Sequence, residues 1–292
     1  MRRIVYFLHA IGMLFLFSSC IKEDMDDCVI THTVKVYVKD KNYSNIESVF
    51  QLVKKDENLP YRAFIGTIYY QLRDIKTGKI VEEKLDNVLS DGDQFYTIKF
   101  NNIPQGDYNL TVWGNIQSET AMTTGMLHNN GNELTDTYVA NKNISFTSET
   151  FSDLLMLERA KGDLLLLCSN FPPGITQVEQ KVTSLYDTVD PYLKYTGNTT
   201  VLKTGPVKPL IETMLAPSVT GGSSKLHLRF FSNTATAASK ELVVPEILLV
   251  MKRNYITAIE ANYNKITGAL EIWTYINEEW TMVHQLDILN TK

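Results

Sequence analysis

An alternation of apolar and polar residues with a period of two is the feature that most constrains this chain. The segment from Thr33 to Val38 shows it cleanly, and similar runs rich in β-branched and aromatic residues recur along the sequence. Turn residues separate these runs roughly every ten to fifteen positions, and no helical crossover lies between them. The pattern predicts antiparallel β-sandwiches and argues against a parallel sheet.

The predicted strands fall into two sets. The first set is 33–38, 68–72, 80–85, 95–100 and 108–113, and the second is 164–168, 225–231, 246–251, 254–262, 269–276 and a strand through Trp280 and Val283. Turns are expected at Lys76–Lys79 and at Lys265–Gly268. Residues 190–224 are rich in Pro, Gly, Ser and Thr, so we expect mostly long loops there. The spacing of Ile46, Val49, Phe50 and Val53 predicts one short helix within residues 44–60.

The first residues have the pattern of an export signal. Arg2 and Arg3 precede an apolar run from Ile4 to Phe17. This run is about fourteen residues long, shorter than the roughly twenty that a membrane-spanning helix needs. We therefore expect residues 1–19 to be a signal peptide. The mature chain of about 270 residues is long enough for two domains, predicted at 31–158 and 159–292.

The sequence around Cys20 is similar to the lipobox of bacterial lipoproteins. Ser18 and Ser19 are small enough to lie in a peptidase cleft, and the thiol of Cys20 is the nucleophile that takes the lipid. Two or three acyl chains anchor a protein stably, since each buried methylene contributes about 0.8 kcal/mol. The alternative is an ordinary secretory signal with a cysteine near its cleavage site.

An acidic stretch follows Cys20, and residues 20–30 are predicted to be a lipidated tether. Lys22, Glu23 and Asp24 are similar to the tag that sends lipoproteins of Bacteroidota-type cells to the outer face of the outer membrane. The other interpretation is a solvated, flexible tether, which the composition also supports. The acidic residues lack the Gly and Glu positions of an EF-hand, so no metal site is expected.

Charge and cysteine content limit the partners. The net charge is −5, and no basic run is present, which argues against a nucleic-acid partner. After lipidation of Cys20, two cysteines remain, Cys28 and Cys168. In an oxidising compartment they could form a disulfide, and the alternative is two separate buried thiols.

Several short motifs, taken in order, resemble the lipid-anchored anchor subunits of type V fimbriae. They are the start from Cys20 to Cys28, the strand and turn from Thr67 to Gly78, the turn from Ile103 to Tyr108 with Val112-Trp113-Gly114, and Leu157-Glu158-Arg159 before an apolar strand. The resemblance implies two tandem transthyretin-like β-sandwich domains. It also implies a structural role at the base of a fimbria, with attachment to outer-membrane lipid through Cys20.

The resemblance further implies partners. Subunits of such fibres are joined by strand addition, in which an extended segment of one subunit completes a sheet of the next. We therefore expect fimbrial shaft subunits as partners, and a host or bacterial surface ligand reached through the assembled fibre. The segment from Trp280 to Lys292 either completes its own domain or extends outward.

Two other functions remain open. A surface glycan-binding lipoprotein would also be a tethered β-sandwich, and Tyr69-Tyr70 and Tyr192-Tyr195 are aromatic residues available to it. A shaft or tip fimbrial subunit is the second alternative. Enzymatic activity is not expected, because the sequence lacks a zinc-type histidine spacing, a nucleophile elbow and a phosphate loop. No cofactor is expected.

Overall fold

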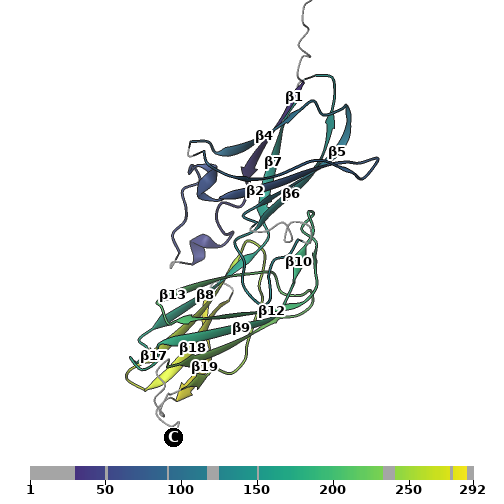
Figure 1. Cartoon of the computed structure of the whole chain (residues 1–292). Coiled ribbons are helices and arrows are strands. Elements are labelled where there is room, and N and C mark those ends of the chain that lie inside the picture. The colour runs from purple at the N-terminus through teal and green to yellow at the C-terminus, as the bar shows by residue number, and fades with distance from the viewer. Residues whose placement is uncertain are drawn as a thin grey trace, which may run out of the picture.

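The computed structural model describes residues 30–49, 52–90, 92–116, 125–149, 151–232, 241–276 and 279–287. Two β-sandwiches lie end to end (Figure 1). Strands β1 to β7 form the first sandwich, and β8 to β19 form the second. The prediction of an all-β chain built from tandem β-sandwiches is confirmed.

The first sandwich is a curled sheet with strand order β3-β2-β5-β6-β7-β1-β4. Strands β6 and β7 pair only at Tyr138 and Val139, so the sheet folds there into two layers around one core. The strands are β1 (Thr31–Val38), β2 (Thr67–Asp74), β3 (Ile80–Asn87), β4 (Phe95–Asn101), β5 (Gly106–Gly114), β6 (Tyr138–Phe146) and β7 (Phe151–Arg159).

Alternation along each strand assigns its side chains to the core or to the outer face. In β2, Ile68 and Leu72 are buried in the core. Because successive side chains in a strand point to opposite faces, Tyr69, Gln71 and Arg73 lie on the outer face. They are aligned there with Trp113, Thr111 and Asn109 of β5. The outer face of this sheet is therefore apolar near Tyr69 and polar beyond it.

The second sandwich has two sheets, β12-β9-β14-β15 with β16 beside β14, and β13-β8-β17-β18-β19. Its longer strands are β8 (Gly162–Ser169), β9 (Gln177–Leu185), β12 (Thr199–Pro206), β13 (Leu210–Leu215), β14 (Ser224–Phe231), β17 (Ile256–Asn264), β18 (Ala269–Ile276) and β19 (Glu279–Asp287). The short strands are β10 (Thr188–Val189), β11 (Tyr195–Thr196), β15 (Leu242–Val243) and β16 (Ile247–Leu249).

Strand β8 is buried on both faces, which explains its continuous apolar sequence. Leu164 and Leu166 face the core between the two sheets. Leu165 faces the other way and packs with Ile46 and Val49, which come from the first part of the chain. An apolar run without alternation is what such a doubly covered strand requires.

Each sandwich contains one parallel pair, which differs from the predicted antiparallel arrangement. Strand β1 pairs parallel with β7, and β8 pairs parallel with β17. A parallel pair needs a long crossover connection. The intervening strands of the same sandwich supply that connection, so no helix is needed.

Two local predictions were wrong. Residues 190–224 contain β11, β12 and β13 in place of long loops. The predicted short helix is only a 3₁₀ turn at Ile46–Ser48, because Ile46 and Val49 pack on a sheet while Val53 is exposed. Among the described residues, no helix is long and apolar enough to cross a membrane.

Candidate functional site: a braced junction and free sheet edges

The segment between β1 and β2 crosses from the first sandwich to the second. We call its residues 40–49 and 52–59 the strap. Ile46 and Val49 lie buried against Leu165, Ile256 and Ala258 of the second sandwich. Burial of two such side chains contributes roughly 1.5–3 kcal/mol each. The strap therefore links the two sandwiches. The sequence of residues 44–60 did not indicate this role.

Polar contacts fix the position of the strap. Nδ2 of Asn45 donates to the carbonyl of Ile256 at 2.9 Å, and its Oδ1 accepts from the Ile256 N–H at 2.9 Å. The N–H of Ser44 donates to the carbonyl of Asn254 at 2.9 Å. The strap thus satisfies backbone groups at the start of β17, before the described pairing of β17 with β18 begins at Ala258.

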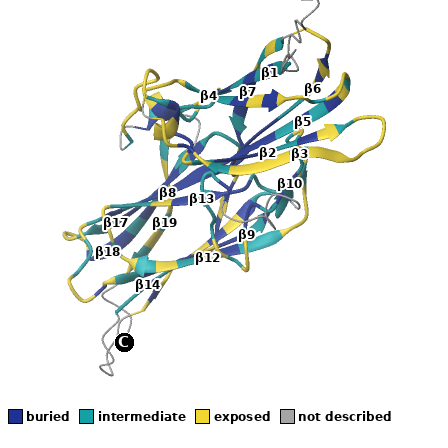
Figure 2. Cartoon of the chain, turned by 45° about the horizontal axis from the view of Figure 1, so that its top comes forward, coloured by how far each residue is buried: buried dark blue, intermediate teal, exposed yellow. Residues whose placement is uncertain are grey.

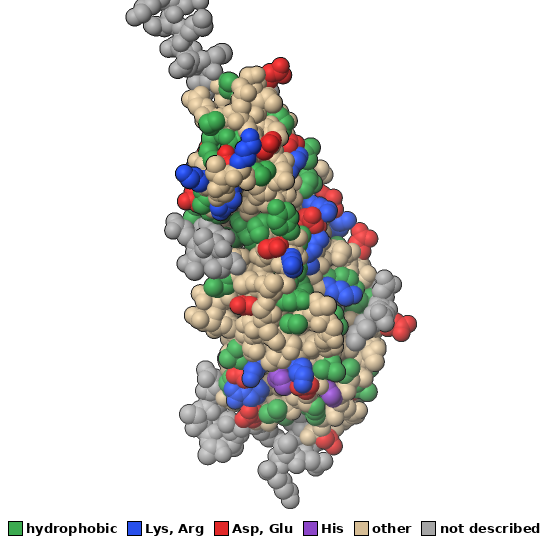
Figure 3. Space-filling model, turned by 90° about the vertical axis from the view of Figure 1, so that its right-hand side faces the viewer, with side chains coloured by type: hydrophobic (Ala, Val, Ile, Leu, Met, Phe, Trp, Pro, Cys, Tyr) green, Lys and Arg blue, Asp and Glu red, His purple; other side chains and the backbone are tan. Residues whose placement is uncertain are grey.

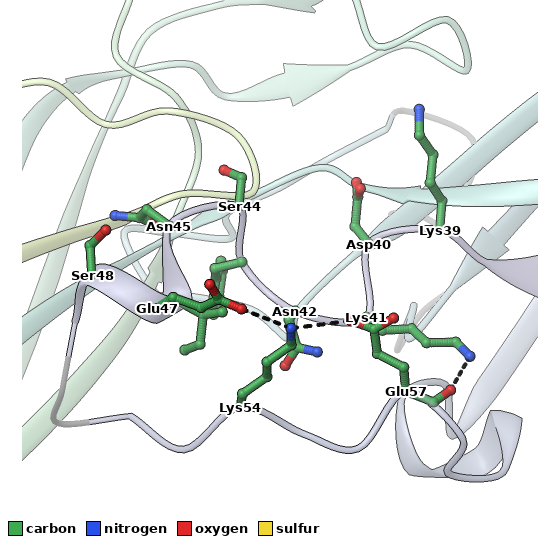
Figure 4. A pocket seen from close by; sticks show the side chains of 12 residues that line it. Lys39, Asp40, Lys41, Asn42, Ser44, Asn45, Glu47, Ser48, Lys54 and Glu57 are labelled. Atoms are coloured by element: carbon green, nitrogen blue, oxygen red, sulfur yellow. Dashed lines mark hydrogen bonds and ion pairs between the residues drawn. The ribbon is translucent and has the colours of Figure 1, made fainter.

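The outer part of the strap is a polar loop around a cavity of about 420 Å³ (Figure 4). Nζ of Lys54 lies 3.0 Å from Oε1 of Glu47 and 3.7 Å from Oε1 of Glu57. Nζ of Lys41 donates to the carbonyl of Glu57. These ion pairs are exposed, and exposed pairs contribute little stability, so they close the loop without strongly bracing the junction.

A buried arginine lies at the centre of the junction. Nε of Arg159 donates to both carboxylate oxygens of Asp136, at 3.1 and 2.9 Å. Its other nitrogens donate to Oδ1 of Asn254 at 2.7 Å and to the hydroxyl of Tyr138 at 2.5 Å. The guanidinium also lies 4.1 Å from the ring centroid of Tyr43. Burial acts to lower the pKa of Arg159, but Asp136 and the two tyrosines outweigh it and raise that pKa.

A second arginine joins the two sandwiches from the opposite direction. Arg253, in the loop before β17, lies 3.1 Å from a carboxylate oxygen of Asp40 and 2.8 Å from one of Glu158. It also donates to the carbonyl of Arg159 at 3.1 Å. Both arginines therefore connect the end of β7 to the loop preceding β17.

The β10–β11 ribbon reaches back from the second sandwich to the first. Val189 of this ribbon packs in one buried cluster with Tyr69, Trp113 and Val139 of the outer face. Gly125 approaches the ribbon closely, since a Cβ on it would lie 1.8 Å from the Val189 carbonyl oxygen. Strap and ribbon thus cross the junction in opposite directions, and each packs on an outer sheet face of the other sandwich.

Several buried polar side chains lie beside the junction. Burial lowers the pKa of Lys161 to about 7 and raises that of Asp163 to about 7. Burial also lowers the pKa of His128 to about 3, and its Nε2 accepts from the N–H of Ala216 at 3.0 Å. Nζ of Lys161 and Oδ2 of Asp163 have no hydrogen-bond partner among the described residues. Burial of these polar groups without partners lowers the free energy of unfolding at the point where the two sandwiches meet.

Both sandwiches have edge strands. Strand β3 ends one side of the first sheet and is exposed along its length (Figure 2). Strand β19 ends one side of the second sandwich and is also largely exposed. An edge strand offers unpaired N–H and C=O groups to an added strand. On the face shown in Figure 3, acidic and basic side chains are interspersed.

These edges lie at different distances from the start of the described chain. Thr31 pairs with Asn101 at the tip of the first sandwich, and β1 runs from there to the junction. Asp287 of β19 pairs with Ala269, next to the β17–β18 turn. The start of β1 and the end of β19 therefore lie at opposite tips of the molecule (Figure 1).

Most of the site residues predicted from the sequence lie outside the described residues. These are Cys20, Lys22, Glu23, Asp24 and Cys28. The lipidation, the export tag and the Cys28–Cys168 disulfide therefore stay predictions. Cys168 itself is a buried thiol in the core of the second sandwich, and burial raises its pKa to about 12. No group of three His, Cys, Asp or Glu side chains among the described residues is arranged to hold a metal ion.

Sequence reasoning missed the residues that build the junction, chiefly Asn45, Asp136 and Arg253. Of the motif Leu157-Glu158-Arg159, which the family resemblance singled out, Arg159 lies in the junction. The predicted boundary at 158/159 stays a prediction. Among the described strands, β7 ends at Arg159 and β8 begins at Gly162.

Solved structures share this fold. A candidate adhesin from Bacteroides thetaiotaomicron matches with a TM-score of 0.54 and 11% identity, over 88% of this chain and 99% of its own. A candidate polysaccharide-binding protein from the same species matches with a TM-score of 0.52 and 11% identity, over 87% and 98%. The fimbrial anchor protein Mfa2 from Porphyromonas gingivalis matches with a TM-score of 0.50 and 11% identity, over 88% and 100%.

The fold is one found in fimbrial and adhesin structures. The resemblance to a fimbrial anchor noted in the sequence is thus matched at the level of structure. The matches span both sandwiches, because they cover almost nine-tenths of this chain. No protein-family model matches the sequence, and a search of curated proteins finds no match.

Proposed function

We propose that this protein is a fimbrial subunit that anchors a fibre to the outer membrane through lipid on Cys20. One observation carries the proposal. The strand nearest Cys20 begins at one tip of the molecule, an edge strand ends at the other tip, and a doubly braced junction lies between them.

The braced junction suits a protein that transmits force. A pull between the lipid and a distal partner would pass through β1, the junction and the second sandwich. Strap and ribbon both resist separation, because each buries apolar side chains against the opposite sandwich. The predicted tether of residues 20–30 can span at most about 40 Å, which holds the first sandwich close to the membrane.

The proposed partner is a fimbrial shaft subunit that adds an extended strand to β19. This edge lies farther from the lipid than β3 does, so a fibre joined there would extend away from the cell surface. Met282 and Val283 of β19 are exposed apolar side chains that an added strand would cover. The acidic residues after Cys20 place the protein, in this proposal, on the outward face of the outer membrane.

Substitution of the lipidated cysteine tests the proposal in the native cell. Cys20→Ala should release both the protein and its fibres into the medium, as followed by immunoblotting and electron microscopy. Cys28→Ala is the matched control and should leave the fibres attached. Fibres that stay on Cys20→Ala cells, or cells that make no fibre at all, would rule out the anchor role.

A further inference from the structure

A cleft lies on the outer face of the first sandwich, beside the β10–β11 ribbon. Its volume is about 390 Å³, within the range of small-molecule sites. Strands β2, β5 and β6 form its floor, and Asp190, Pro191 and Tyr192 of the ribbon form one wall. The anchor role proposed above does not use this cleft.

The floor of the cleft carries two rows of polar side chains. Gln71, Thr111 and Asn141 are aligned across β2, β5 and β6 in one row. Arg73 and Asn109 are aligned in the next row, and Asn143 of β6 continues this row outside the cleft lining. The floor is therefore rich in amides. Their N–H groups donate to neighbouring side chains, and the oxygens of Gln71 and Asn141 can each accept one further hydrogen bond.

Hydrogen bonds hold these amides in place. Nδ2 of Asn109 donates to Oδ1 of Asn141 at 2.8 Å, and Nδ2 of Asn141 donates back to Oδ1 of Asn109 at 2.8 Å. Nδ2 of Asn141 also donates to the hydroxyl of Thr111 at 2.7 Å. These side chains are only partly buried. A ligand would thus meet a preorganised polar surface, which lowers the entropy cost of binding.

The charged groups of the cleft are already engaged. Arg73 donates to Oε1 of Gln71 at 2.8 Å and to the carbonyl of Gly78 at 2.5 Å. Oδ1 of Asp190 accepts from the N–H groups of Tyr192 and Lys194, at 2.8 and 2.9 Å. Among the residues that the structure describes, the cleft therefore has no cluster of available cations for an anionic ligand.

An exposed aromatic ring stands at the wall of the cleft. Tyr192 is 71% exposed, whereas Tyr69, Tyr70 and Tyr195 lie in buried clusters or pack against them. The two hydrogen bonds to Asp190 fix the backbone of the turn that presents Tyr192. A second cavity of about 310 Å³, over β6 and β7, is also lined by Tyr192 and shares Asn141 and Pro191 with the first.

We propose that this cleft binds a neutral oligosaccharide, with Tyr192 stacking on a sugar ring and the amide oxygens of Gln71 and Asn141 accepting hydrogen bonds from its hydroxyls. Sugar hydroxyls donate hydrogen bonds that these oxygens can accept, and the apolar face of a sugar ring suits an aromatic side chain. A peptide strand fits less well. Strands β2 and β5 each pair with neighbours on both sides, so their backbone groups are not open to strand addition.

Glycan-array binding tests the proposal with the mature full-length protein in detergent micelles. The probes are immobilised neutral oligosaccharides, with sialylated and sulfated oligosaccharides printed beside them. We expect neutral probes to be bound. Tyr192→Ala should weaken that binding by roughly tenfold, the upper range for loss of one aromatic contact. Asn141→Ala should weaken it at least as much.

Controls separate loss of the site from loss of the fold. Tyr37→Ala truncates a tyrosine on β1, outside the cleft, and should bind as the wild type does. The thermal unfolding midpoint of each variant identifies any misfolded protein. Failure to bind any neutral probe would overturn the proposal, as would preference for sulfated probes or equal binding by Tyr192→Ala. Fibre attachment should be normal in Tyr192→Ala cells, so this test is independent of the anchor role.

Discussion

Asn45 binds the backbone of Ile256 through both ends of its amide, with two hydrogen bonds of 2.9 Å across the junction. The two residues are far apart in the sequence, and each hydrogen bond is partly buried. Asn45 therefore satisfies backbone groups at the start of β17, before the described pairing with β18 begins at Ala258.

Asn45→Ala should detach the strap from the second sandwich. Loss of two hydrogen bonds that satisfy buried backbone groups should cost about 2 kcal/mol of unfolding free energy in urea titrations. Hydrogen exchange should rise at the start of β17. Asn42→Ala is the control, because Asn42 bonds only within the strap, to Lys55. Equal exchange at β17 in both variants would show that Asn45 does not hold the strap.

Arg159→Gln should weaken the junction more than any exposed ion pair could. The substitution leaves Asp136 with a partly buried charge and no guanidinium, and breaking such a buried pair costs about 3 kcal/mol or more. Lys84→Met breaks the exposed pair with Asp86 and should cost less than about 1 kcal/mol. Urea denaturation of the two variants compares them. Similar losses would contradict a central role for Arg159.

Lys161 should make stability depend on pH above neutrality. Its pKa is about 7 in the folded protein and 10.5 in the unfolded chain, so the unfolded chain binds more protons between these values. The free energy of unfolding should therefore rise from pH 7 to pH 10, by up to roughly 4 kcal/mol. Lys161→Met should remove this rise. It should also stabilise the protein at pH 7, because it replaces a buried amine that has no hydrogen-bond partner among the described residues with an apolar group.

Asp163 should act in the opposite direction at lower pH. Its pKa is about 7 in the folded protein and 3.8 in the unfolded chain, so stability should fall as pH rises from 4 to 7. Asp163→Asn should remove the pH dependence of the free energy of unfolding between pH 4 and 7 and leave the dependence above pH 7 unchanged. The asparagine keeps the oxygen that accepts from the Thr213 N–H. Urea titrations at several pH values distinguish the two windows. An unchanged profile in both variants would show that neither group titrates as described.

The β19 edge should control fibre assembly. Met282→Lys with Val283→Lys adds two charges that oppose the covering of this edge, a device that natural edge strands use against added strands. We expect a correctly localised protein and few or no attached fibres. Leu248→Lys changes an exposed residue of β16 and is the control. Normal fibres in the double variant would show that β19 is not the edge that accepts the added strand, and β3 would be tested next.

Cys168 should react slowly with thiol reagents in the native protein. The thiol is buried, and its raised pKa keeps the thiolate fraction small at neutral pH. Unfolding in guanidinium chloride without reductant should make it react at once if it is a free thiol. A reaction that requires reductant would instead support the disulfide with Cys28.

Local pattern was sufficient for most of the strands. Alternation in Thr33–Val38 and turn residues at Lys76–Lys79 and Lys265–Gly268 are signals within a few residues of each other, and the structure has β1 and the two hairpins where they indicated. The sequence also indicated that 164–168 is a buried strand, although not why both of its faces are covered. Strands β12 and β13 were missed because the Pro, Gly, Ser and Thr residues of the whole segment 190–224 favoured loops, although β13 itself contains only Thr213 of these.

The sequence by itself determined that this chain is built from strands with one apolar face, because side-chain direction in a strand follows from backbone geometry alone. Only the tertiary structure decided which outer faces are covered and which remain open. The contacts of Asn45 with Ile256, and of Val189 with Trp113, join residues that no local pattern relates. The same packing covers the apolar row at Tyr69 and leaves the amide rows beside Tyr192 open.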